Sequence, residues 1–158
     1  GKQAQDILTE LQNFSSPIDL SSIEKNQRFN EAIRTKTKSA EFSKSLDRLK
    51  RLVKLWNKNP NAKNHTAYKA INQVSSAYID GADFWSCAIS HLTPFEFSMT
   101  LSVDECQTKE RIEKYNILTY QDLETYIFER DVLKITEAIF SRGTTAFKSE
   151  KLSLPRSD

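Results

Sequence analysis

Two cysteines and two histidines are the residues best suited to metal binding or nucleophilic catalysis. Cys87 and His91 lie four residues apart, so on a helix they would share a face, a spacing that metal ligands sometimes use. Cys106 and His65 would have to complete such a site, and neither lies at zinc-finger spacing. A catalytic cysteine needs an accessible thiolate beside the imidazole, whereas Cys87 has apolar neighbours. We therefore expect no metal site and no cofactor, and we interpret both cysteines as free thiols.

Acidic residues occur in close pairs, as at Asp104-Glu105 and at Glu110 and Glu113. None of these pairs has the apolar surroundings that shift a carboxyl pKa for acid–base catalysis. The chain also has no phosphate-binding loop, dinucleotide fingerprint or nucleophile elbow, and only three glycines. We expect no catalytic residue and favour a protein that is not an enzyme. An enzyme whose catalytic groups are dispersed along the chain ranks third, after the two binding hypotheses given below.

A basic amphipathic helix is the clearest pattern in the chain. From Phe42 to Trp56, apolar residues recur at steps of three and four, which places Leu46, Leu49 and Val53 on the same side. Lysines and arginines occupy the opposite side, interrupted by Leu55. The candidate binding residues are the cations of this helix and its flanks, together with that leucine: Arg34, Lys36, Lys38, Lys44, Arg48, Arg51, Lys54, Leu55, Lys58, Lys63 and Lys69.

The charge distribution leaves three interpretations of this basic segment, the third of which is an acidic protein or an anionic membrane as the partner. Residues 25–69 carry thirteen Lys or Arg and three Asp or Glu, whereas residues 70–141 carry five and twelve. Lysine and arginine rows bind nucleic-acid phosphates by displacing counterions, which is the nucleic-acid hypothesis for residues 34–69. The plainer interpretation is a solvated face that the acidic half of the same chain partly neutralises.

Helical periodicity and capping signals predict an all-α domain of six to eight short helices, packed as an irregular bundle. In chain order, the predicted helices span residues 2–13, 21–35, 40–57, 65–79, 82–91, 102–115 and 120–141. Asp80-Gly81 is interpreted as a break and Arg142-Gly143 as the end of the last helix. The predicted organisation is one helical domain over 1–142 and a mobile tail or linker over 143–158. Asn116 is expected to form a left-handed C-cap.

Residues 93–103 carry conflicting signals. Thr93, Pro94 and Glu96 match the start of a helix, while the apolar residues from Phe95 to Val103 alternate as in a strand. A single strand would lack a partner for its backbone groups. We favour a helix, with one short strand near 95–103 as the alternative.

Four aromatic residues, Phe84, Trp85, Phe95 and Phe97, lie around Thr93-Pro94. The plain interpretation is that they form part of the core, and the sharper one is an exposed patch or groove that receives a partner helix.

The sequence therefore favours a non-enzymatic interaction module that docks a protein partner, or a second copy of itself, through helix faces. Nucleic-acid binding through residues 34–69 is the alternative. No stretch approaches the roughly 20 apolar residues of a membrane span, and two free thiols suggest an intracellular, reducing location.

Overall fold

The computed structural model describes residues 2–15, 40–117 and 125–149. Its helices are α1 (Lys2–Ser15), α3 (Ala40–Lys58), the short 3-10 helix η1 (Ala62–Asn64), α4 (Tyr68–His91), α5 (Thr108–Lys114) and α6 (Glu129–Ser149). Three short strands, β1 (Thr93–Phe95), β2 (Ser98–Ser102) and β3 (Tyr126–Phe128), form one small sheet. The mainly helical class is confirmed, with five α-helices in these three segments rather than six to eight. The helix predicted over 21–35 lies outside the described residues.

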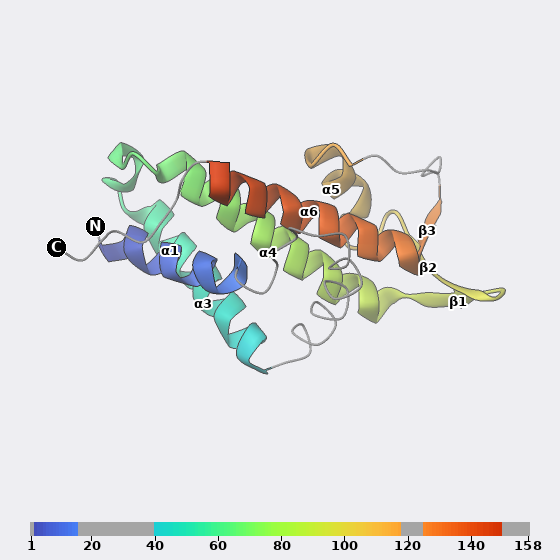
Figure 1. The fold of residues 1–158 in the computed structure, drawn as a ribbon. Coiled ribbons are helices and arrows are strands. Elements are labelled where there is room, and N and C mark those ends of the chain that lie inside the picture. Colours follow the sequence, from blue (N-terminus) through green and yellow to red (C-terminus); the bar gives the residue numbers. More distant parts are fainter. Residues whose placement is uncertain (1, 16–39, 118–124, 150–158) are drawn as a thin grey trace.

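Helices α4 and α6 form the centre of the molecule and run side by side along its length (Figure 1). Two glycines allow their close approach. A Cβ atom at Gly81 would lie 3.2 Å from ring carbons of Phe140, and one at Gly143 would lie 2.7 Å from the Tyr78 ring. Both rings are buried, so neither glycine can gain a side chain without displacing a core residue.

These two glycines explain two errors of the sequence analysis. Glycine commonly marks a helix boundary, but here α4 continues through Gly81 to His91, and α6 continues through Gly143 to Ser149. Ala146 and Phe147 in the last turns of α6 are buried. The first seven residues of the predicted tail therefore belong to a packed helix, and residues 150–158 lie outside the described part.

Helices α1 and α3 pack against each other and against α4 through their predicted apolar sides. Ile7 and Leu11 of α1 are fully buried, as is Leu49 of α3, and Trp56 is nearly so. Leu46 and Val53 pack partly buried beside them. The predicted apolar side of α3 is therefore confirmed for Leu46, Leu49, Val53 and Trp56. The Phe42 side chain is not among those that the structure describes.

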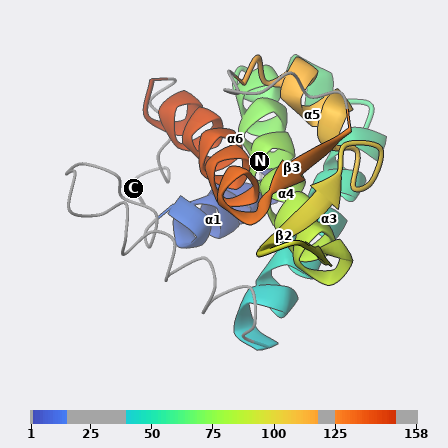
Figure 2. The ribbon, with the colours of Figure 1, turned by 90° about the vertical axis from the view of Figure 1, so that its right-hand side faces the viewer.

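Residues 93–102 form a β-hairpin, so the favoured helix was wrong and the strand alternative was closer. Strand β2 pairs antiparallel with β1 and, on its other side, with β3, where Leu101 is opposite Ile127. Both of these side chains are buried. The partner strand lies within the helix predicted from residue 120, which in the structure begins only at Glu129. Figure 2 shows β2 and β3 at the end of the molecule nearest the viewer.

Helix α5 begins at Thr108 rather than at the capping signal near Ser102. The turn before it contains two residues with positive φ, Cys106 (56°) and Gln107 (49°). The predicted left-handed conformation of Asn116 is confirmed, with a φ of 49°. Ile117 then donates its backbone N–H to the carbonyl of Ile112 at 3.0 Å, which closes the end of the helix.

Among the helices of residues 2–15, 40–117 and 125–149, none combines the length and the apolar composition that a membrane span requires.

Candidate functional site

The turn between β1 and β2 exposes a phenylalanine at a position that usually holds a small residue. Phe95 pairs with Ser98, so Glu96 and Phe97 form a two-residue turn. Such turns favour Asn and Gly because they need positive φ angles, yet Glu96 adopts a φ of 54°. This conformation costs a residue with a Cβ roughly 1–2 kcal/mol. The Phe97 side chain is 104% exposed, so it contributes nothing to the core.

Three further aromatic side chains extend this surface across the sheet: Phe95 and Tyr126 are exposed, and Phe128 is half-buried. The Phe95 ring lies 5.6 Å from that of Tyr126, and Tyr126 lies edge-on to Phe128 at 5.7 Å. The guanidinium of Arg130 lies over the Phe128 ring at 5.4 Å. We call Phe95, Phe97, Tyr126 and Phe128 the aromatic surface. The rings of Phe95, Tyr126 and Phe128 are held by one another, and Phe128 also by Arg130, which lowers the entropy that these three side chains lose when a partner binds.

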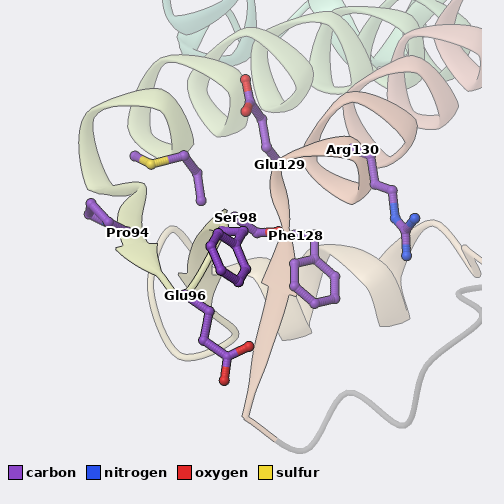
Figure 3. Close-up of a pocket in the computed structure, with 8 residues that line it drawn as sticks. Pro94, Glu96, Ser98, Phe128, Glu129 and Arg130 are labelled. Atoms are coloured by element: carbon purple, nitrogen blue, oxygen red, sulfur yellow. The ribbon is translucent and has the colours of Figure 1, made fainter.

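A groove of about 580 Å³ lies beside the aromatic surface (Figure 3). Its apolar lining comes from Pro94, Phe97, Met99 and Phe128, and its polar lining from Glu96, Ser98, Glu129 and Arg130. The lining residues come from the hairpin, from β3 and from the first turn of α6. An apolar floor with a charged edge is the usual anatomy of a protein interface.

The aromatic residues grouped in the sequence divide into two sets in the structure. Phe84 and Trp85 are buried in α4, as the core interpretation requires, whereas Phe95 and Phe97 are exposed. Tyr126 and Phe128 were missed as surface residues, because they were assigned to a helix. The short aromatic run Tyr126-Ile127-Phe128 was the available signal, since such residues favour strands.

The predicted basic face is present on α3. Lys44, Arg51, Lys54 and Lys58 are exposed, and none of them makes an ion pair within the described segments. Leu55 is 51% exposed among them, as predicted. The remaining predicted residues do not all join this face. Lys63 and Lys69 are exposed beyond the end of α3, while Arg34, Lys36 and Lys38 lie outside the described residues.

Arg48 differs from the other cations of α3 because it serves the fold. It donates to the Glu10 carboxylate of α1 at 3.0 Å, and the Ser45 hydroxyl donates to the second Glu10 oxygen at 2.9 Å. Glu10 is only 4% exposed. A second ion pair, Lys50 with Asp83 at 2.7 Å, joins α3 to the acidic half of the chain. Among the described residues, this is the single ion pair through which the acidic half of the chain neutralises a cation of α3.

Cys87 and Cys106 form a disulfide, so the free-thiol interpretation was wrong. The hairpin folds back and brings Cys106 to the last turn of α4, with a Cα–Cα distance of 5.7 Å. His91 lies beside the bond, its Nδ1 3.7 Å from Cys87 Sγ and 4.0 Å from Cys106 Sγ. The prediction of an intracellular location loses its supporting argument, since disulfides persist mainly in oxidising surroundings.

His65 is not part of this cluster. Its ring packs edge-on against Trp56 at 5.4 Å, and its Nδ1 accepts the backbone N–H of Ala67 at 3.1 Å. The sequence had suggested that His65 and Cys106 would both be needed to complete a site with Cys87 and His91. The structure brings Cys106 to the pair and leaves His65 at the end of α3.

A second hollow, of about 450 Å³, lies between α4, α5 and α6, where polar contacts join α5 to α4. Its wall contains Lys114 and Tyr115, which both bind the Asp80 carboxylate of α4, the lysine at 2.7 Å. Burial, followed by the hydrogen bond to Asp80, raises the pKa of the Tyr115 hydroxyl. The network fastens α5 to α4.

Comparison with known proteins adds no relative. No protein family, curated protein or solved structure matches this chain.

Proposed function

We propose that this protein is a non-enzymatic interaction module that binds an apolar segment of a partner protein at the aromatic surface and its groove. The observation that carries the proposal is Phe97, a fully exposed aromatic side chain held at the tip of a turn with a positive φ. Neither feature stabilises the fold. Residues that break local folding preferences without a structural benefit are expected where a protein functions.

The composition of the surface supports a protein ligand. Exposed aromatic residues and arginine are the side chains that contribute most to binding energy in protein interfaces. An apolar side chain of the partner would fill the groove against Met99 and Phe128, while Phe97 covers it from the turn. Glu96, Glu129 and Arg130 at the edge would select partners with polar groups in matching positions.

Self-association is the simplest form of this proposal, and it can be tested without a known partner. Light scattering over a range of concentrations should show a mass that rises with concentration for the unmodified protein. The Phe97→Ser variant should stay monomeric, while Leu55→Ser, a matched exposed apolar residue on α3, should behave like the unmodified protein. A unit mass at every concentration would exclude self-association and leave a different protein as the partner.

The basic face of α3 supports a second candidate function, nucleic-acid binding. Its specific support is the group of exposed cations without ion-pair partners in the described residues, Arg51, Lys54 and Lys58 among them. Contacts of this kind weaken steeply as salt is added.

The discriminating experiment measures binding to generic DNA and RNA at several salt concentrations. If the basic face binds nucleic acid, the triple variant R51E/K54E/K58E should lose that binding, and Lys109→Glu on α5 should retain it. Absence of salt-dependent binding by the unmodified protein would remove this candidate. Arg48 is left intact, because a glutamate there would face the buried Glu10.

A further inference from the structure

The disulfide and its neighbouring histidine place three metal-ligating side chains at one point on the surface. One ligand atom from each of Cys87, His91 and Cys106 lies within 4.8 Å of the other two. Cys87 and Cys106 are partly buried and His91 is exposed, so small ions can reach the cluster from solvent.

Two parts of the fold hold the three residues in this position. Cys87 and His91 lie one turn apart at the end of α4, so their side chains share a face. Cys106 arrives from the far side of the hairpin, at the positive-φ turn that precedes α5. Cys87 lies in a packed helix, and the partly buried Cys106 packs against the hydrophobic core.

The spacing suits a tetrahedral zinc ion. Zinc binds sulfur at about 2.3 Å and imidazole nitrogen at about 2.0–2.1 Å, which puts two such ligands of a tetrahedron roughly 3.6 Å apart. The His91 Nδ1 already lies 3.7 and 4.0 Å from the two sulfur atoms. The two sulfur atoms, joined by the covalent bond, would have to separate to roughly 3.8 Å to fit the same tetrahedron.

We infer that the reduced protein binds one zinc ion through Cys87, His91 and Cys106, and that the disulfide is the oxidised, metal-free form of the same site. Water fills the fourth position, as in other three-ligand zinc sites. The inference is independent of the proposed binding at the aromatic surface. The site then acts as a redox-controlled switch: Cys87 and Cys106 are joined by the disulfide when oxidised and by the zinc ion when reduced.

The chemical steps balance with named reactants. A dithiol supplies two electrons and two protons to the disulfide, yielding two cysteine thiols, and itself becomes a cyclic disulfide. Zinc then displaces one proton from each thiol. In the reverse direction, hydrogen peroxide takes two electrons from the two thiolates and, with two protons, becomes two water molecules. The cysteines are rejoined and zinc is released.

The histidine must give up the proton on Nδ1 when zinc binds. In the disulfide form Nδ1 lies 2.9 Å from the Cys87 carbonyl oxygen, which can only accept, so Nδ1 carries a proton. Zinc takes the place of that proton on Nδ1, and the coordinated imidazole is neutral with its proton on Nε2.

Zinc titration of the full chain, reduced with a non-thiol phosphine and compared with the oxidised chain, tests this inference. The measurement is zinc content by competition with a chromophoric chelator, and the expected result is one zinc per reduced chain and none per oxidised chain. His91→Ala keeps both cysteines and should weaken binding at least about tenfold, whereas His65→Gln should not. Circular dichroism of each variant checks that the fold is retained.

Two results would overturn the inference. One is a reduced chain that takes up no stoichiometric zinc. The other is equal zinc affinity for the reduced chain and its His91→Ala variant, which would show that the histidine is not a ligand. The Cys106→Ser variant gives a second readout, because it should bind no zinc under either condition.

Discussion

The pairing of Arg48 with Glu10 shows how a residue in a basic row can act inside the fold. Arg48 looks from the sequence like one of five equivalent cations, but Glu10 below it is buried and accepts from Arg48 and Ser45. A surface ion pair contributes about 0–1 kcal/mol. Here the loss of the arginine would leave a buried carboxylate with one donor among the described residues, and that cost dominates.

Arg48→Ala should therefore lower the free energy of unfolding by about 1–3 kcal/mol. Arg51→Ala, on the same face but without an ion-pair partner in the described residues, should change it by less than about 0.5 kcal/mol. Urea denaturation at neutral pH measures both. Equal effects of the two substitutions would show that the Glu10 contact does not stabilise the fold.

Tyr115 predicts a dependence of stability on alkaline pH. Burial and Asp80 raise the pKa of its hydroxyl above the ordinary 10.0. Below pH 10 the hydroxyl is protonated in both states and contributes no slope. Above pH 10 the unfolded chain loses the proton while the folded chain keeps it, so stability falls as pH rises.

Tyr115→Phe should reduce this alkaline slope by up to one proton equivalent. The measurement is the free energy of unfolding between pH 8 and 11 for both proteins. Tyr78, whose pKa is also raised by burial, keeps part of the slope in the variant. An unchanged slope would contradict the assignment to Tyr115.

At the scale of the elements, the α4–α6 contact depends on two glycines of unequal tolerance. The Cβ of an alanine at position 143 would lie 2.7 Å from the buried Tyr78 ring, a distance that forces movement in the core. Overpacking of this kind costs about 1–3 kcal/mol, against a gain in helix propensity of about 1 kcal/mol.

Gly143→Ala should therefore destabilise the protein in thermal or urea unfolding. Gly81→Ala, where the nearest ring carbon is 3.2 Å away, should have an effect closer to zero. The reverse order of the two effects would mean that the helices are packed differently from this structure.

The disulfide fixes the base of the hairpin to the end of α4. It closes a loop with a sequence separation of 19 residues. Restricting a loop of that length in the unfolded chain is worth about 3 kcal/mol. Reduction in metal-free buffer should lower the unfolding midpoint accordingly, and a C87S/C106S variant should show no response to the reductant. A midpoint unaffected by reduction would mean that the bond does not constrain the chain.

Helices could be predicted where the apolar face of the helix itself indicates how it packs. The strands could not be predicted, because their pairing partners are distant in the sequence. The apolar sides of α1 and α3 follow from their periodicity, and the left-handed Asn116 follows from its position after α5. The strand pairing of residues 98–102 with 126–128 could not be read locally, since neither segment reveals the other. A glycine looks the same in the sequence whether it ends a helix or allows two helices to approach closely. Gly81 and Gly143 were therefore interpreted as helix boundaries.

The candidate site was predicted in part. Phe95 and Phe97 were predicted to lie either in the core or in an exposed patch. In the structure both side chains are exposed. Lys44, Arg51, Lys54, Lys58 and Leu55 on α3 are exposed as predicted. Arg48 is exposed as well, but it pairs with the buried Glu10 of α1. Cys106 could not be placed beside His91 from spacing, because the intervening hairpin was expected to be a helix.

At the scale of the whole molecule, the exposed features lie at distinct places on one helical core. The aromatic surface lies on the sheet and hairpin, whereas the basic face lies along α3 (Figures 1 and 2). The two surfaces can therefore be altered separately, and a partner that binds one should be insensitive to substitutions in the other.

The central claim is that a protein partner docks at the turn of the hairpin. The most direct test replaces Phe97 with a benzophenone-bearing phenylalanine analogue and irradiates the protein in an extract of its source cells. A second protein carries the same group at Leu55 as the control. We predict one discrete cross-linked product from position 97, absent from position 55 and suppressed by excess unmodified protein but not by the Phe97→Ser variant. Cross-linking from position 55 alone, or none from position 97, would contradict the claim.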